Sequence, residues 1–131
     1  MSGARKPLRW PRFWLGLFWL AVAVVWAGCL LPSPDVALPQ GSDKLEHALA
    51  YFLLAASGVQ LWRGWRALAW LALGLLTMGA AIEVAQATLT ASRQADGVDL
   101  LADAVGIVAG IALALTPMRD LLLRWFPARA G

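Results

Sequence analysis

The sequence predicts an all-α integral membrane protein, a single domain over residues 1–131 that forms a bundle of four transmembrane helices. Of its 131 residues, 60% are hydrophobic and only 15% are charged, whereas soluble domains have about a quarter charged residues. A soluble core of this size could not bury so much apolar surface, so lipid is the expected solvent. Because no segment alternates polar and apolar residues, membrane-spanning strands are not expected.

Four apolar stretches carry this prediction, at residues 13–31, about 45–62, 67 to about 89 and 98 to about 116. A spanning helix needs about 20 residues, with about 17 as a lower limit, so the second stretch is marginal. Clear breaks separate the stretches: proline-containing segments at 32–35 and 39–42, a polar turn at 63–66, a polar loop at 90–97, and Pro117.

The basic residues fix the expected orientation. With four spans, one side of the membrane holds a single acid, Asp120, and nine basic residues: Arg5, Lys6, Arg9, Arg12, Arg63, Arg66, Arg119, Arg124 and Arg129. The other side holds Lys44, Arg93 and nearly all the acids. The positive-inside rule therefore predicts that both termini are cytoplasmic, with a basic N-terminus at 1–12. The basic, leucine-rich tail at 118–131 is expected to form a short interfacial segment.

The N-terminal stretch has an alternative interpretation as a secretory or lipoprotein signal, ending in Trp26-Ala27-Gly28-Cys29. The length of the stretch and the tryptophan before the Ala-Gly-Cys favour a retained helix. A single cysteine excludes an internal disulfide and a CxxC metal site. The positive charges lie in short caps between apolar runs, so nucleic-acid binding is not expected.

On this topology, three helix ends deliver polar side chains to one face of the membrane, the extracytoplasmic face. The residues are Asp43, Lys44, Glu46 and His47 in the second helix, Glu83 and Gln86 in the third, Arg93 and Asp96 in the loop, and Asp99 and Asp103 in the fourth. Acids within a membrane helix are costly and normally face a protein interior or a wet cavity. The convergence predicts a functional site.

Helical spacing refines the site. Asp43, His47 and Tyr51 are four residues apart and share one helix face. Asp99 and Asp103 continue into a GxxxG pair, Gly106 and Gly110, which lets a neighbouring backbone approach closely. This stripe is expected to face the bundle, although the glycines could instead serve a homo-oligomer.

Several of these residues also have structural interpretations. Asp43 and Asp96 are suited to cap helices, and Lys44 could anchor its helix at the interface. Tyr51 is expected to pack, Glu46 to face solvent, and Arg93 could form an ion-pair lock with Glu83.

Three motifs resemble those of the VanZ-like family over residues 35–115. Asp43-Lys44-Leu45-Glu46-His47 followed by Tyr51 resembles its D-K-x-x-H-x-x-x-Y signature, and Glu83-Val84-Ala85-Gln86 resembles its E-x-x-Q. Arg93, Asp99, Gly106 and Gly110 resemble its R…D…N-x-x-G-x-x-x-G ending, except that Asp103 stands where the family usually has Asn. The resemblance implies a small multi-pass protein of the bacterial inner (cytoplasmic) membrane with a role in the cell envelope. The family's named member is associated with teicoplanin resistance.

Two functions of different classes follow. The first is binding of an amphipathic envelope ligand, such as a lipid-linked precursor, a phospholipid or a lipoglycopeptide. The residues expected to contact it are Asp43, Lys44, His47, Glu83, Gln86, Arg93, Asp99 and Asp103.

The alternative is a membrane-embedded hydrolase or transferase acting on an envelope lipid. His47 would be its general acid or base, and Glu83, Asp99 and Asp103 are the candidates for catalysis and for holding a divalent cation. No cofactor is otherwise indicated, and the chain contains no G-x-S-x-G or P-loop nucleophile motif. A channel is disfavoured because no polar track continues to the cytoplasmic side.

Overall fold

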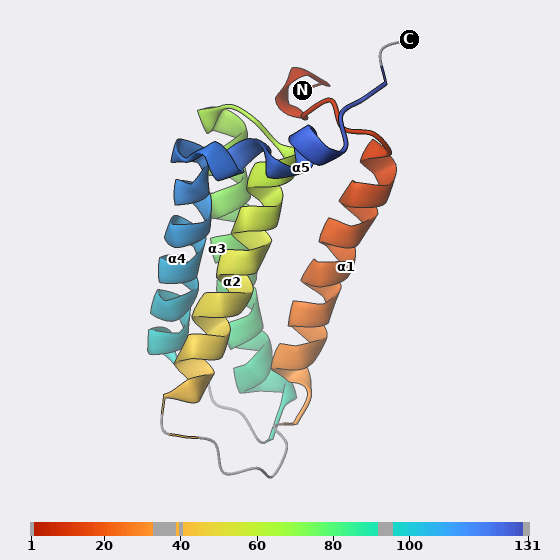
Figure 1. The fold of residues 1–131 in the computed structure, drawn as a ribbon. Coiled ribbons are helices and arrows are strands. Elements are labelled where there is room, and N and C mark those ends of the chain that lie inside the picture. Colours follow the sequence, from red (N-terminus) through yellow and green to blue (C-terminus); the bar gives the residue numbers. More distant parts are fainter. Residues whose placement is uncertain (1, 33–38, 40, 92–95, 130–131) are drawn as a thin grey trace.

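The fold is a bundle of long helices that run alternately up and down (Figure 1). The computed structural model describes residues 2–32, 39, 41–91 and 96–129. The long helices are α1 (Pro11–Leu30), α2 (Ser42–Leu61), α3 (Trp65–Leu89) and α4 (Gly97–Ala112). Short helical turns follow at Leu113–Leu115, Pro117–Asp120 and α5 (Leu121–Trp125), and another lies at Ser2–Ala4. Among the described residues there is no strand, only two isolated bridges, so the all-α prediction is confirmed.

Within the ranges that the structure describes, three segments are long and apolar enough to cross a membrane: α1, α3, and α4 extended to Leu115. The helix α2 is as long as α1, at 20 residues, but it is not one of them. Its first two turns carry Asp43, Lys44, Glu46 and His47, which lower its hydropathy. The structure therefore supports a membrane protein with three apolar spans.

The helix boundaries differ slightly from the predicted ones, for local backbone reasons. The helix α2 begins at Ser42, about three residues earlier than expected, and α3 begins at Trp65 rather than residue 67. Each follows a glycine with positive φ, Gly41 at 86° and Gly64 at 85°. Glycine adopts this conformation without steric cost, so the chain reverses sharply and a helix can start at once.

The helices α2 and α4 pack closest, because Gly106 and Gly110 face α2. A Cβ atom at Gly106 would collide with the carbonyl oxygen of Ala48, and one at Gly110 would lie 2.6 Å from the Ala55 Cβ. Beside this seam, α2, α3 and α4 enclose a core that contains Tyr51, Leu54, Ala55, Leu75 and Ile107. The predicted GxxxG contact is thus made inside the bundle.

The helix α1 packs loosely. Phe18 is its only buried residue, with its ring 5.1 Å from that of Trp62 on the neighbouring chain segment. A groove of about 950 Å³ separates α1 from α3 and is lined by Trp19, Trp26, Leu71, Met78 and Ala81, among others. Because apolar side chains line it, the groove is compatible with hydrocarbon.

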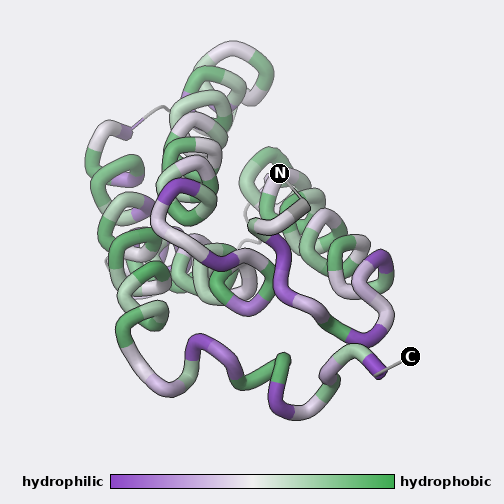
Figure 2. The backbone as a smooth tube through the Cα atoms, turned by 90° about the horizontal axis from the view of Figure 1, so that it is seen from above, coloured by the Kyte–Doolittle hydropathy of each residue, from purple (hydrophilic) through white to green (hydrophobic). Residues whose placement is uncertain are grey.

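The two terminal segments cross the same end of the bundle, where hydrophilic residues collect (Figure 2). Backbone hydrogen bonds join them: the Arg9 amide donates to the Phe126 carbonyl at 2.8 Å, and the Ala128 amide donates to the Pro7 carbonyl at 2.9 Å. The predicted tail is therefore tied to the bundle, and α5 lies across its end.

We call these two hydrogen-bonded terminal segments the terminal clamp. Lys6 is buried at its centre, with 7% of the residue exposed. Its Nζ lies 2.9 Å from Asp120 Oδ1 and also donates to the Arg119 carbonyl. The Lys6 ammonium holds the pKa of Asp120 below its ordinary value. Sequence patterns do not predict this contact, because it joins residues 114 positions apart.

Candidate functional site

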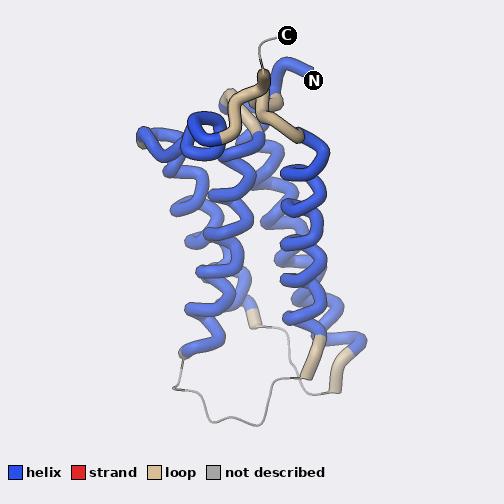
Figure 3. The backbone as a smooth tube through the Cα atoms, turned by 45° about the vertical axis from the view of Figure 1, so that its right-hand side comes forward, coloured by secondary structure: helices blue, strands red, loops and turns tan. Residues whose placement is uncertain are grey.

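The polar site lies at the end of the bundle opposite the termini, where α2 and α4 begin and α3 ends (Figure 3). Five of the predicted residues are at most 8% exposed there: His47, Glu83, Gln86, Asp99 and Asp103. The side chains of Lys44 and Asp43 are 30% and 59% exposed, which places them at the rim. Arg93 lies outside the described residues.

His47 and Asp103 form the innermost contact of the site. His47 Nδ1 lies 2.9 Å from Asp103 Oδ1, and both residues are buried. With a proton on Nδ1, this bond fixes the ring and directs Nε2 toward Asp99, 3.7 Å from Asp99 Oδ2. The predicted face of α4 is confirmed, since Asp99, Asp103, Gly106 and Gly110 are all buried.

Lys44 connects the two helix starts. Its Nζ lies 2.5 Å from Asp99 Oδ1, 2.6 Å from Asp96 Oδ2 and 3.0 Å from Asp43 Oδ2. The ammonium lowers the pKa of Asp96 through the second of these contacts. Lys44 is therefore neither a simple interfacial anchor nor a free anion-binding group, because carboxylates already surround it.

Asp96 caps α4, as its position suggested. Its Oδ1 accepts a hydrogen bond from the Val98 amide at 2.9 Å. Asp43 does not cap α2; the N-cap position belongs to Gly41, and Asp43 lies in the first turn against Lys44. Asp96 also contacts Lys44 and so belongs to the polar site, although it was not among the residues expected to contact the ligand.

Glu83 reaches from α3 to the start of α4. Its Oε2 accepts a hydrogen bond from the Asp96 amide at 2.6 Å. The residue is 8% exposed, and its Oε1 is buried without a hydrogen-bond partner among the described residues. The predicted lock with Arg93 lies outside the described residues.

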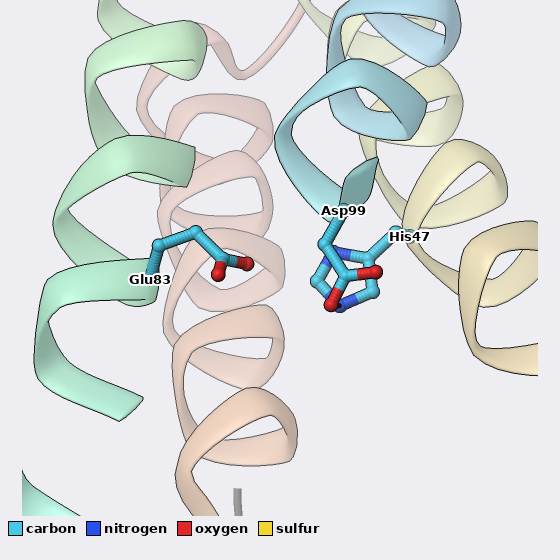
Figure 4. A group of neighbouring side chains, drawn as sticks. All are labelled: His47, Glu83 and Asp99. Carbon is cyan, nitrogen blue, oxygen red and sulfur yellow. Dashed lines mark ion pairs between the residues drawn. The ribbon is translucent and has the colours of Figure 1, made fainter. Parts of the chain in front are cut away.

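His47, Glu83 and Asp99 converge from three helices (Figure 4). Each offers a ligand atom, and these atoms lie within 4.8 Å of one another. The predicted cation-binding set was Glu83, Asp99 and Asp103. The structure instead groups His47 with the first two acids, because Asp103 is engaged with His47 Nδ1 on the far side of the ring.

Gln86 does not join this group. Its Nε2 donates to the carbonyl of Cys29 at 2.9 Å, which ties the ends of α1 and α3 together. Gln86 Oε1 is buried without a hydrogen-bond partner among the described residues. Gln86 therefore has a structural role in holding α1, and its contact with a ligand stays a prediction.

Tyr51 lies beneath the site. A Cβ atom at Gly79 would lie 2.6 Å from Asp103 Oδ2 and 3.3 Å from the Tyr51 hydroxyl, so both side chains abut α3 at this glycine. Tyr51 is 1% exposed, and within the described part of the chain its hydroxyl has no hydrogen-bond partner. Tyr51 packs as predicted, and it also places a polar atom near Asp103.

Comparison with known proteins adds no family assignment: the chain matches no protein-family model, no curated protein and no solved structure. The arguments for function therefore rest on the residues and geometry described above.

Proposed function

We propose that this chain is a VanZ-like protein of the bacterial inner membrane that binds the polar part of an amphipathic envelope ligand at its extracytoplasmic end. The observation that carries the proposal is the convergence of His47, Glu83 and Asp99 from three helices. These residues belong to three separate sequence motifs of the VanZ resemblance. The fold brings residues of these three motifs together at one end of the bundle.

The proposed topology has four spans and cytoplasmic termini. The helix α2 runs beside the three apolar spans, and its polar turns lie at the end away from the termini (Figure 1). The terminal clamp and the basic turn at Arg63 and Arg66 lie at the opposite end, which the positive-inside rule places in the cytoplasm. In this arrangement, only the apolar middle of α2 faces lipid.

The charge of the site selects the chemistry of the ligand. Among the residues that the structure describes, five carboxylates, from Asp43, Glu83, Asp96, Asp99 and Asp103, surround the Lys44 ammonium and the His47 imidazole. Such a site favours an amine or hydroxyl donor over a bare phosphate, because an anion would face uncompensated negative charge. A lipoglycopeptide, a lipid-linked glycopeptide precursor and an amine-bearing phospholipid all carry these groups. The apolar groove beside α1 could hold the hydrocarbon part.

A second function, a membrane-embedded hydrolase or transferase, is favoured by one specific observation. The His47–Asp103 contact orients an imidazole whose Nε2 lies 3.7 Å from Asp99 Oδ2. A histidine positioned in this way is suited to general acid–base chemistry. Mass spectrometry of envelope lipids after incubation with the purified protein would reveal a product, whereas a binding protein leaves the lipids intact.

Binding is tested with the purified protein in lipid nanodiscs. In one experiment the protein is titrated with teicoplanin. In another the nanodiscs are prepared with either phosphatidylethanolamine or phosphatidylglycerol. We expect saturable binding of an amine-bearing ligand, weakened at least tenfold in Glu83→Gln. Glu46→Gln is the matched control, since Glu46 is exposed on the same end of the bundle. Equal affinity in the two variants, or no preference for amine-bearing ligands, contradicts the proposal.

Topology is tested by single-cysteine labelling in intact cells, in a variant without Cys29. Cysteines at Ala91 or Ser42 should react with a membrane-impermeant maleimide, whereas one at Gly3 or Gly64 should react only after permeabilisation. Labelling of Ala91 and Gly64 from the same side would disprove the arrangement of four spans.

A further inference from the structure

His47, Glu83 and Asp99 offer an imidazole nitrogen and carboxylate oxygens to the centre of the site. Atoms of these kinds bind metal ions in proteins. Each of the three converging side chains has one polar atom engaged with a residue outside the group. His47 Nδ1 contacts Asp103, Asp99 Oδ1 contacts Lys44, and Glu83 Oε2 accepts from the Asp96 amide. Of the other polar atoms, His47 Nε2 and Asp99 Oδ2 lie 3.7 Å from each other, and Glu83 Oε1 is buried without a hydrogen-bond partner among the described residues.

Glu83 supplies an independent indication of a ligand. A buried carboxylate oxygen without a partner costs free energy, on the order of 1–3 kcal/mol or more for a charged group. Glu83 Oε1 is such an atom, in a residue that is 8% exposed. Its carboxylate points across the gap between helices toward His47 and Asp99 (Figure 4). A cation held there would satisfy it.

We propose that His47, Glu83 and Asp99 bind a divalent transition-metal ion, with Asp103 orienting the histidine. Two carboxylates and a neutral imidazole balance the charge of a divalent ion. Three protein ligands also leave a coordination position open, as in catalytic rather than structural sites. The inference rests on the proposed function in one respect: the open position would face the headgroup of the bound ligand.

The geometry requires only small adjustments. Donor atoms around a tetrahedral ion with bonds of about 2.0–2.1 Å lie roughly 3.3 Å apart. His47 Nε2 and Asp99 Oδ2 are already 3.7 Å apart, and all three ligand atoms lie within 4.8 Å. Metal binding would then require the Glu83 carboxylate to move closer to the other two side chains. The Asp103 contact is the usual partner of a metal-binding histidine, which donates its other ring N–H to a carboxylate.

The ligand set also indicates which metals bind. Imidazole suits zinc, iron, copper and nickel, whereas magnesium and calcium prefer oxygen ligands alone and more of them. We therefore expect Zn²⁺ and Co²⁺ to bind more tightly than Mg²⁺ or Ca²⁺.

The test uses the full chain with its affinity tag removed, after chelation and transfer to metal-free buffer. Isothermal titration with Zn²⁺ should give one site per chain, and Zn²⁺ should raise Tm by several degrees. Co²⁺ should produce a visible absorption band of a four- or five-coordinate site. Glu83→Gln and His47→Gln should abolish binding and the absorption band, whereas Glu46→Gln should retain both.

Asp103→Asn separates the orienting role from direct ligation. It should weaken Zn²⁺ binding by about 10- to 100-fold without removing it, as loss of an outer partner typically does. Circular dichroism and gel filtration of each apo variant establish that it is folded. For folded variants, absence of stoichiometric Zn²⁺ binding in the wild type overturns the metal site, as does equal binding in Glu83→Gln and Glu46→Gln.

The outcome is distinguishable from failure of the proposed function. If chelated protein still binds an amine-bearing ligand and never binds Zn²⁺, the metal inference is wrong and ligand binding stands. If Zn²⁺ binds as expected but no envelope ligand does, the metal site stands and the proposed function fails.

Discussion

His47 Nδ1 and Asp103 Oδ1 lie 2.9 Å apart in the interior of the bundle, where the two residues are 8% and 1% exposed. The contact joins α2 to α4 within the seam that Gly106 and Gly110 bring close. The hydrogen bond therefore lies within the packed interface between α2 and α4. Substitutions can distinguish the contribution of the hydrogen bond from that of the packing.

Replacing Asp103 with Asn should preserve the fold, because the amide oxygen can still accept a bond from His47 Nδ1. Replacing it with Leu leaves a buried N–H without a partner, at a cost of about 1–3 kcal/mol. We expect Asp103→Leu to be the less stable variant by at least ~1 kcal/mol. Tryptophan fluorescence during unfolding by a denaturing detergent measures the stability of both variants. Equal stabilities would show that the hydrogen bond contributes nothing.

Gly106→Ala should destabilise the bundle, because the new Cβ would meet the backbone of α2 at Ala48 and Phe52. Overpacking of this kind typically costs about 1–3 kcal/mol. Gly74→Ala is the control, since nothing lies within 4 Å of its Cβ position in α3. That change should be neutral or stabilise by up to about 1 kcal/mol, because alanine favours helix. Equal effects of Gly106→Ala and Gly74→Ala in the same unfolding assay would contradict the close packing of α4 against α2.

The contact of Lys6 with Asp120 should make stability depend on acid pH. In the folded protein the pKa of Asp120 is lowered by the hydrogen bond from Lys6, so folding favours the ionised form. The stabilisation is present above the unfolded pKa of about 4 and is lost as the pH falls below it. Asp120→Asn should therefore lower Tm at neutral pH, and its difference from wild type should shrink below pH 4. A difference independent of pH would indicate lost packing instead, and Glu46→Gln serves as the control for a surface acid.

Gln86→Leu should release the end of α1 from α3 while keeping the side chain's bulk. Gln86 Nε2 donates to the Cys29 carbonyl, and α1 has few other buried contacts at this end. We expect faster hydrogen exchange of backbone amides at residues 26–30, with the amides of α2 and α4 unchanged. Uniform acceleration across all four helices would instead indicate global destabilisation.

The fold was largely predictable because its determinants are local. Apolar length, proline breaks and positive-φ glycines set the helices, and spacing by four residues placed Asp99, Asp103, Gly106 and Gly110 on one buried face. Spacing does not set how far one helix rotates about its axis relative to the next. The arrangement of His47 among the acids could therefore not be predicted: its Nδ1 contacts Asp103, whereas the group that could hold a metal ion joins it to Asp99 and Glu83.

Two further features had no local signal. Lys6 sits in a basic run typical of a solvated cytoplasmic end, yet it is buried against Asp120. Gln86 shares a helix with Glu83 and was expected in the same site, but its amide turns to a backbone carbonyl of α1. Both depend on tertiary partners distant in sequence, which periodicity cannot reveal.

The unequal packing of the helices bears on which sequences can encode this bundle. Only one residue of α1 is buried, so most of its positions require no more than an apolar side chain of any shape. At positions 106 and 110 of α4, by contrast, even a methyl group meets the backbone or Cβ of α2. In a saturation mutagenesis experiment, tolerance should be broad along α1 and narrow along the facing surfaces of α2 and α4. The information that specifies this fold is concentrated in a minority of its residues.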